Sequence, residues 1–365
     1  MTRGTVIKRC SAIPWNAALR QAFSIATGSH ASMENVLFRV ELASGDVGYG
    51  EAAPAPHVTG ETQNRTLLNL RGEARKLAGK DCADYLSFLP ELHERLSGNH
   101  CAAAAAEMAV LGALSSHASV PLYSLFGGAR TRIASDMTVV LGSVDEARRD
   151  AEGIRLRGIK TFKIKLGGDP DADFLRVLAV HQAAPKGVIY LDANQSYTAE
   201  SILRLLRRLR RAHVEISVLE QPVPQEDWDG MRKVTRESAV CVLADESVQS
   251  QSDAVKVIRL RAAHAVNIKT AKFGLLRGAE MARLCSAAGL KLMIGGMLES
   301  AIAMGNSAHL ACGLGCFDFV DLDTPLFVRD RITSGPLGPS SDGIYRLDRV
   351  KRGLGAAPCA ASTRP

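Results

Sequence analysis

The feature of this sequence that most limits its possible folds is a β-strand-like segment that recurs along residues 136–323. Each segment is apolar and ends at polar residues, and successive segments are 24 to 28 residues apart. The eight segments are DMTVVLG, TFKIKLGG, VIYLDANQ, ISVLEQP, VCVLADES, HAVNIKT, KLMIGG and FDFVDLD. Sequences with helical periodicity, such as SVDEARRDAEGIRLRG and RGAEMARLCSAAGL, lie between them. This alternation predicts an α/β fold in which the parallel strands close into a barrel.

The polar residues that end these strands should share one location. In such barrels the C-terminal ends of the strands form a single mouth, where active sites are built. Lys163 and Lys165 are two residues apart on one strand, so their side chains point the same way. We expect them to face three carboxylates from the next three strands, Asp192, Glu220 and Asp245.

The three carboxylates predict a bound cation, because they would repel one another without one. A ligand set made only of oxygen atoms suits Mg²⁺ better than zinc. For any one of these acids a surface salt bridge is the better explanation, but three acids at successive strand ends argue against it. We therefore predict one Mg²⁺ per subunit, bound by Asp192, Glu220 and Asp245.

The lysines indicate proton transfer at a carbon atom. Lys269 ends the sixth strand and should lie across the barrel from Lys165, with room between them for a small acid bound to the metal. Mg²⁺ and Lys163 would stabilise the enediolate that forms when the α-proton of a carboxylate is removed. The neighbouring positive charges and partial desolvation would lower the pKa of Lys165 enough for it to act as a base. With one lysine on each face of the carbon, this arrangement permits racemisation or epimerisation.

Together these motifs resemble those of a known family. The set Lys163-x-Lys165, Asp192-x-Asn194, Glu220-Gln-Pro, Asp245-Glu-Ser and Asn267-Ile-Lys269 resembles the enolase superfamily in its muconate-lactonising subgroup. In that superfamily, a lysine base that works beside Mg²⁺ is a known case of pKa tuning. The resemblance covers nearly the whole chain and implies a TIM-like barrel of modified (β/α)7β form with an N-terminal α+β capping domain. Residues 48–62 resemble the capping loop, and residues 106–128 resemble the helical link into the barrel.

The resemblance also implies three regions. The expected boundaries are 1–130 for the capping domain, 131–330 for the barrel with the catalytic site, and 331–365 for a C-terminal segment that returns to the capping domain. The last stretch, after Gly355, is small and polar, which predicts a disordered tail.

Asp321 and Asp323, expected on one side of the eighth strand, distinguish between members of the subgroup. They resemble the Asp-x-Asp pair of dipeptide epimerases, which holds the free α-amino group of the substrate. The resemblance therefore implies a dipeptide as the substrate. A strand end that merely binds the following loop is the alternative explanation, because Asp-x-Asp is common at turns.

Other residues are implied as substrate contacts, namely Thr138, Asn194, Gly296, Met297, Leu298 and Thr27. Epimerases that act on Ala-Glu bind the glutamyl carboxylate through an arginine in the capping loop. The matching window, residues 23–32, has neither arginine nor lysine, which argues against a glutamyl substrate. Phe23 and Ile25 in that window, with Met297 and Leu298, indicate a more apolar pocket. His30 and His57 are more typical of solvated loop residues than of substrate contacts.

The net charge of +7 raises the question of a nucleic-acid partner. The densest basic run, LRLLRRLRR at residues 203–211, places its arginines on one helical face and its leucines on the other. This pattern is typical of a solvated helix face over a buried stripe, and no aromatic residues interleave it. We expect neither a nucleic-acid partner nor a transmembrane segment. The absence of a signal peptide and of paired cysteine spacing predicts a cytoplasmic protein, expected to be a homo-oligomer.

Three functions remain open from the sequence. The first is a Mg²⁺-dependent dipeptide epimerase that inverts the α-carbon next to the carboxylate by two-base 1,1-proton transfer. The second is an o-succinylbenzoate synthase, an N-acylamino acid racemase or a muconate-type cycloisomerase. The Asp-x-Asp pair argues against this group. The third is a non-catalytic basic binding protein, against which the complete set of lysines and carboxylates argues.

Overall fold

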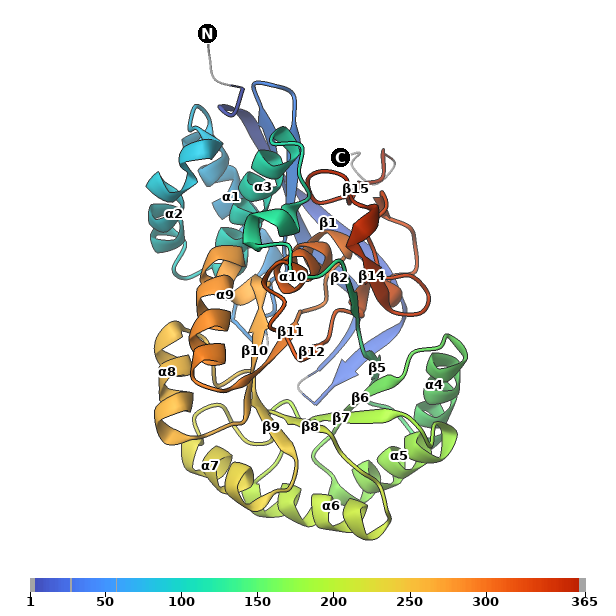
Figure 1. Cartoon of the computed structure of the whole chain (residues 1–365). Helices are drawn as coiled ribbons and strands as arrows, with labels where there is room; N and C mark the ends of the chain where they lie inside the picture. Colours follow the sequence, from blue (N-terminus) through green and yellow to red (C-terminus); the bar gives the residue numbers. More distant parts are fainter. Residues whose placement is uncertain (1–3, 27, 57, 361–365) are drawn as a thin grey trace.

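The structure is a computed structural model that describes residues 4–26, 28–56 and 58–360. The N-terminal part is an antiparallel sheet of β1 (Ile7–Ile25), β2 (Gly28–Leu42) and β3 (Val47–Ala52). Helices α1 (Gln63–Leu77), α2 (Leu89–Arg95) and α3 (His100–His117) lie beside this sheet, at the top of Figure 1. A Cβ atom at Gly48 or Gly50 would collide with the backbone of α3, so these glycines let β3 and α3 pack closely.

Eight parallel strands follow, and each pairs with its neighbours in chain order. They are β5 (Met137–Val139), β6 (Thr161–Lys165), β7 (Val188–Asp192), β8 (Val218–Glu220), β9 (Cys241–Ala244), β10 (Ala265–Lys269), β11 (Lys291–Gly295) and β12 (Phe319–Val320). The backbone N–H of Asp136 donates to the carbonyl of Val320 at 2.9 Å, which joins the first strand to the last. The predicted barrel with an N-terminal α+β unit is therefore confirmed.

Helices connect consecutive strands and cover the outside of the barrel (Figure 1). They are α4 (Val144–Leu156), α5 (Pro170–Ala183), α6 (Ala199–Arg211), α7 (Trp228–Glu237), α8 (Gln251–Leu260), α9 (Thr270–Ala287) and α10 (Ala301–Leu314). The start of α4 is fixed by a capping box, in which Ser143 and Glu146 each bond the other's backbone N–H. No α-helix follows β12 within residues 321–360, as the (β/α)7β form requires. None of the described helices combines the length and the apolar character needed to span a membrane.

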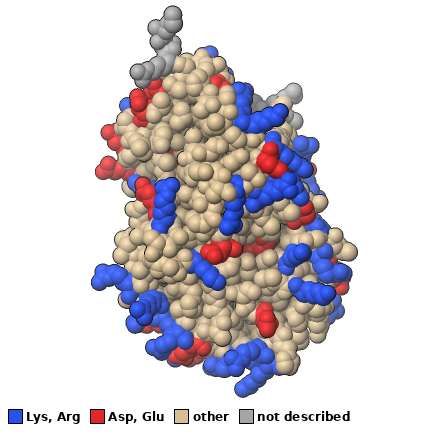
Figure 2. Space-filling view, viewed as in Figure 1, with Lys and Arg blue, Asp and Glu red and all other residues tan. Residues whose placement is uncertain are grey.

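The basic run at residues 203–211 lies in α6. Leu203, Leu206 and Leu209 are buried against the barrel, whereas Arg204 and Arg207 are exposed. The predicted solvated face over a core stripe is confirmed. Figure 2 shows Lys and Arg side chains along the lower rim of the molecule, where α6 lies.

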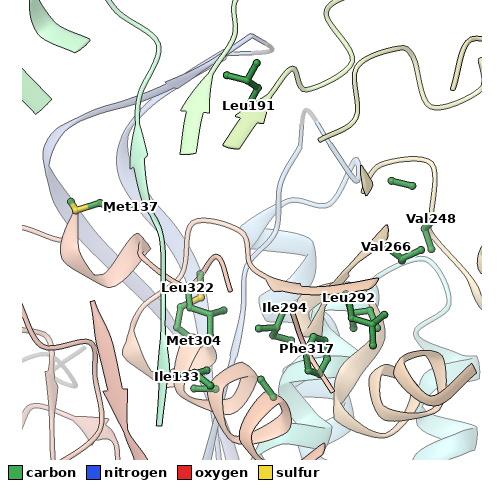
Figure 3. Close-up of a cluster of buried hydrophobic side chains, with 14 of the residues drawn as sticks. Ile133, Met137, Leu191, Val248, Val266, Leu292, Ile294, Met304, Phe317 and Leu322 are labelled. Atoms are coloured by element: carbon green, nitrogen blue, oxygen red, sulfur yellow. The ribbon is translucent and has the colours of Figure 1, made fainter. Parts of the chain in front are cut away.

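Alternation along the strands separates the core from the interior of the barrel. Side chains that point outward, such as Leu191, Leu292 and Ile294, pack beneath the helices in the main hydrophobic cluster (Figure 3). Side chains that point inward form two levels. The lower level is an apolar plug made of Tyr190, Val218, Leu243, Ala265 and Met293, and the upper level carries the lysines and carboxylates.

The C-terminal residues return along the link between α3 and β5. Strand β14 (Ile344–Arg346) pairs with β4 (Arg132–Ala134), and β13 (Thr333–Ser334) pairs with β15 (Ala357–Pro358). Disorder was expected after Gly355, but β15 forms there and the N–H of Cys359 donates to the carbonyl of Ile332 at 2.8 Å. These backbone bonds keep the chain ordered past Gly355, while residues 361–365 lie outside the described part. The domain boundaries at 130 and 330 stay predictions.

Candidate active site

A cavity of about 410 Å³ lies at the C-terminal ends of the strands, beneath residues of the N-terminal sheet. Its volume is in the range of small-molecule sites. The barrel supplies Thr138, Lys163, Lys165, Asn194, Asp245, Glu246, Lys269, Gly296, Met297, Leu298, Asp321, Asp323 and Thr324. The N-terminal part covers them with residues of β1, β2 and the stretch after β3, including Phe23, Ile25, His30, Glu34, Ala53, Pro54 and Val58. The structure thus gathers sequence-predicted residues from seven of the eight strand ends.

Two of the predicted metal ligands do not line this cavity. Asp192 and Glu220 lie next to it and are each only 1% exposed. Thr27, predicted to contact substrate, lies outside the described residues, as does His57.

Lys163 lies where three carboxylates meet. Its Nζ atom is 3.0 Å from Asp192 Oδ2, 2.7 Å from Glu220 Oε2 and 2.6 Å from Asp321 Oδ2, and the residue is 2% exposed. Burial by itself would lower the pKa of this ammonium group, but the surrounding carboxylates outweigh it and raise the pKa well above its usual value. Lys163 is therefore a fixed positive charge.

Lys165 and Lys269 stand on opposite walls of the cavity, because three strands separate β6 from β10 in an eight-stranded barrel. Lys165 Nζ is 2.6 Å from Asp192 Oδ2, and Lys269 Nζ is 2.7 Å from Asp245 Oδ2. Desolvation opposes the charge on Lys269, yet Asp245 and Glu220 hold its pKa above the usual value. Each lysine of this pair is thus tied to one carboxylate.

One expected arrangement is wrong. We expected Lys163 and Lys165 to face all three acids, but Asp245 contacts Lys269 and Lys272 instead. Strand register explains the difference. Lys165 pairs directly with Asp192 on the neighbouring strand, whereas Asp245 follows β9, which is next to β10 and its Lys269.

The three predicted metal ligands share a pattern of hydrogen bonds. In each carboxylate one oxygen is held by a neighbouring group and the other faces a lysine. The held oxygens are Asp192 Oδ1 by the N–H of Asn194 at 3.0 Å, Glu220 Oε1 by the side-chain amide of Asn267 at 2.8 Å, and Asp245 Oδ1 by Lys272 at 2.7 Å. The group therefore presents three carboxylate oxygens, one from each residue, toward the lysines.

This group of oxygens fits a hard divalent cation. Glu220 Oε2 lies near Lys163 but accepts no hydrogen bond from the described residues. Burial and the charge of Asp192 raise the pKa of Glu220 to about 8, so a cation placed beside it would favour the charged form of this carboxyl group. A donor set made only of carboxylate oxygens is suited to Mg²⁺.

A second group of acids lies at the seam between β5 and β12. Asp136, Asp321 and Asp323 are buried, and one ligand atom from each lies within 4.8 Å of the others, so they also form a candidate cation site. Neither oxygen of Asp136 has a hydrogen-bond partner among the described residues. Burial and the charges of Asp321 and Asp323 raise the pKa of Asp136 well above its usual value. Asp323 accepts a hydrogen bond from the N–H of Thr138 at 2.6 Å.

The position of Asp321 and Asp323 differs in detail from expectation. Strand β12 ends at Val320, so both acids follow the strand, and Asp323 directly precedes the short helix η3 (Thr324–Leu326). Their carboxyl groups still converge, together with Asp136, which the sequence reasoning missed. Strand alternation could have found Asp136, because it lies two residues before Thr138.

Two further acids were missed. Glu246 accepts from the side-chain amide of Asn194 at 3.2 Å, and burial with the charge of Asp245 raises its pKa to about 7. Glu51 of β3 accepts from the N–H groups of Ser300 and Ala303 at the start of α10. These bonds anchor the N-terminal sheet beside residues 296–298, which line the cavity. No local sequence pattern would identify them.

The part of the cavity that comes from the N-terminal region combines apolar and polar side chains. Phe23 and Ile25 contribute apolar side chains to it. Among the described residues of this part, Glu34 supplies a carboxylate. Those residues include no arginine or lysine. A negatively charged substrate side chain would therefore find no arginine or lysine there.

Comparison with known proteins agrees with this geometry. Residues 146–362 match the family model described as Enolase C-terminal domain-like. The hydrophobic dipeptide epimerase of Citrifermentans bemidjiense is 43% identical over 350 residues, which cover 94% of this chain and 95% of that protein.

Solved structures share the whole fold. The mandelate racemase/muconate lactonizing protein from Herpetosiphon aurantiacus superposes with a TM-score of 0.94 at 39% identity, covering 98% of this chain and 100% of that chain. The dipeptide epimerase from Enterococcus faecalis, in complex with Mg and the dipeptide L-Leu-L-Tyr, superposes with a TM-score of 0.92 at 27% identity. That match covers 96% of this chain and 99% of the other.

Proposed function

Because this chain belongs to the enolase superfamily, we propose that it is a Mg²⁺-dependent dipeptide epimerase. The reaction inverts the α-carbon next to the substrate carboxylate by two-base 1,1-proton transfer. The observation that carries the proposal is that Lys165 and Lys269 line one cavity from opposite walls, with carboxylates between them. Such an arrangement can remove a proton from one face of a carbon and return a proton to the other.

We assign the Mg²⁺ ion to Asp192, Glu220 and Asp245. Each of these residues offers one oxygen whose partner oxygen is already held, which suits the strict geometry that Mg²⁺ demands. When bound, Mg²⁺ supplies positive charge that polarises the substrate carboxylate and makes its α-proton more acidic. Lys163 adds a second fixed positive charge beside the same oxygens.

We assign Asp321 and Asp323 to the α-ammonium group of the dipeptide. Both line the cavity, and burial with the charge of Asp321 raises the pKa of Asp323 to about 7. A cation at this point would therefore relieve repulsion between them. An ammonium ion can satisfy several carboxylate oxygens at once, since it has three N–H donors.

Asn substitutions at these two positions test the dipeptide assignment. Asp321→Asn and Asp323→Asn should each reduce kcat/KM for a free dipeptide by roughly ten- to a hundredfold, at about 1.4 kcal/mol per decade for the lost charge-assisted bonds. The loss should be much smaller for the N-acetyl form of the same dipeptide, which has no ammonium group. The measurement is kcat/KM of wild type and both variants on each form.

The N-acetyl form also serves as an internal control, because Asp321 contacts Lys163 as well. If the Asp321 substitution acted by displacing Lys163, turnover of the free dipeptide and of its N-acetyl form would fall equally. Equal losses, or a wild type that prefers the acetylated form, would contradict the dipeptide assignment. An N-acylamino acid racemase or an elimination synthase would then be the better assignment.

We propose further that the residue being inverted has an apolar side chain. Phe23, Ile25 and Leu298 line the cavity, and Glu34 would repel a glutamyl carboxylate. Relatives named hydrophobic dipeptide epimerase and aromatic dipeptide epimerase, which are 43% and 40% identical, support this class.

The expected preference can be measured directly. L-Ala-L-Phe should exceed L-Ala-L-Glu in kcat/KM by roughly tenfold or more, because burying an apolar side chain is worth about 1.5–3 kcal/mol. Epimerisation of both dipeptides can be followed by polarimetry at saturating Mg²⁺. Preference for L-Ala-L-Glu would contradict an apolar pocket.

One Mg²⁺ per subunit, a homo-oligomeric state and a cytoplasmic location stay predictions. All eight cysteines are free in the structure, which agrees with a reducing compartment. The proposal includes no nucleic-acid partner.

A further inference from the structure

We propose that Lys272 is a positioning residue of the metal site, which holds Asp245 so that only one oxygen of its carboxylate is available to the cation. This inference rests on the proposed function only in taking Asp245 as a Mg²⁺ ligand. It does not depend on the identity of the substrate.

Lys272 is a buried lysine with its ammonium group enclosed by oxygen atoms. The residue is 6% exposed, and its Nζ atom lies 2.7 Å from Asp245 Oδ1, 2.9 Å from the carbonyl of Asp245 and 3.4 Å from the carbonyl of Val248. An ammonium group has three N–H donors, so these three acceptors can satisfy it fully. The contacts hold both the side chain and the backbone of Asp245 and restrict its rotation.

The other oxygen of the same carboxylate meets a different lysine. Asp245 Oδ2 is 2.7 Å from Lys269 Nζ, and Lys269 lines the cavity whereas Lys272 does not. The two lysines therefore divide the two oxygens of Asp245 between the cavity side and the buried side. This makes them a matched pair with equal charge and a shared partner.

The neighbouring carboxylates are held in a similar way. Asn267 holds one oxygen of Glu220, and the backbone of Asn194 holds one oxygen of Asp192. Residues that hydrogen-bond to a metal ligand without touching the metal orient that ligand and commonly tune the metal affinity. Among these three holders only Lys272 is charged. A positive charge so close to a cation opposes metal binding, so its contribution has to come from fixing the ligand.

A break in α9 brings Lys272 to this position. Gly274 has φ +74° and ψ −172°, which separates the first turn of the helix from the rest.

Glu107 of α3 caps this break. It accepts hydrogen bonds from the N–H groups of Leu275 and Leu276, and its other oxygen is 2.7 Å from Nε2 of His93. A Cβ atom at Gly274 would lie 2.7 Å from Glu107 Oε1, so the break and its carboxylate cap need glycine. The N-terminal helices thus fix the turn that carries Lys272.

Magnesium affinity of two matched variants tests the inference. Lys272→Met and Lys269→Met remove the same charge from the two sides of Asp245, and both can be titrated with Mg²⁺ alone by isothermal calorimetry. Coulomb's law predicts that losing either cation strengthens Mg²⁺ binding. If Lys272 positions Asp245, Lys272→Met should instead weaken binding by about tenfold, typical of losing an orienting partner. Lys269→Met should bind as tightly as wild type or more tightly.

Circular dichroism and the thermal midpoint establish that each variant is folded. Wild-type or tighter Mg²⁺ binding by folded Lys272→Met would overturn the inference, as would equal weakening in both variants. Glu107→Gln is the second variant, because it leaves every residue around the cation in place and loosens only the cap of the α9 break. Weaker Mg²⁺ binding by folded Glu107→Gln supports the inference, and unchanged binding contradicts the role of the break.

The two proposals fail separately. A wild type that binds Mg²⁺ but epimerises no dipeptide would contradict the proposed function and leave the role of Lys272 open to the same titration. A wild type that epimerises dipeptides, with a Lys272→Met variant of unchanged Mg²⁺ affinity, would contradict only the inference about Lys272.

Discussion

Lys165→Ala and Lys269→Ala are each expected to stop net epimerisation while still allowing exchange of the α-proton in one epimer. The two lysines line opposite walls of the cavity, so each reaches the proton of only one stereoisomer. Removing a general base reduces the rate by roughly 10²- to 10⁴-fold. The measurement is ¹H NMR of a dipeptide in D₂O with Mg²⁺, started separately from each epimer.

The informative result is the pattern across the two epimers. Lys165→Ala should retain exchange in one epimer, and Lys269→Ala should retain exchange in the other. Mg²⁺ affinity has to be measured in parallel, because both lysines contact carboxylates of the proposed metal site. If one substitution removed exchange in both epimers while the fold and metal binding stayed intact, a single-base mechanism would replace the proposal.

Asp192→Asn and Asp245→Asn are expected to abolish activity by removing the metal. Each substitution replaces an anionic oxygen with a neutral amide, and Mg²⁺ binds through few protein carboxylates, so each contributes strongly. We expect Mg²⁺ affinity to fall by about a hundredfold or more, equivalent to about 2.7 kcal/mol. Titration calorimetry with Mg²⁺ alone measures this directly, and EDTA treatment of the wild type should reproduce the loss of activity.

Asp136→Asn is the matched control for the metal ligands. Asp136 is as deeply buried as Asp192 and belongs to the other acidic group, with Asp321 and Asp323. If Mg²⁺ lies at Asp192, Glu220 and Asp245, the control should keep wild-type affinity within about threefold, less than 1 kcal/mol. Loss of Mg²⁺ binding in Asp136→Asn with normal binding in Asp192→Asn would move the metal to the second acidic group.

The sequence alone determined the order of the elements and the end of the barrel at which the predicted site residues gather. Eight apolar runs at a nearly constant spacing became the eight strands β5 to β12, because the spacing reflects one strand plus one helix. The position of Lys165, Asp192 and Lys269 at strand ends was equally visible. In a parallel barrel every strand end opens on the same mouth, so no distance information was needed to bring these residues together.

Only the tertiary structure decided which charged groups contact one another. Asp245 contacts Lys269 and Lys272 rather than Lys163, since contacts across the barrel depend on strand register and on side-chain reach, neither of which has a local sequence signal. The position of Lys272 depends on the break in α9 at Gly274. Glu107, which lies 167 positions before Gly274 in the sequence, caps this break. The apolar part of the cavity likewise combines the N-terminal sheet with the barrel. Such contacts join segments far apart in the chain, and only packing of the complete fold fixes their distances.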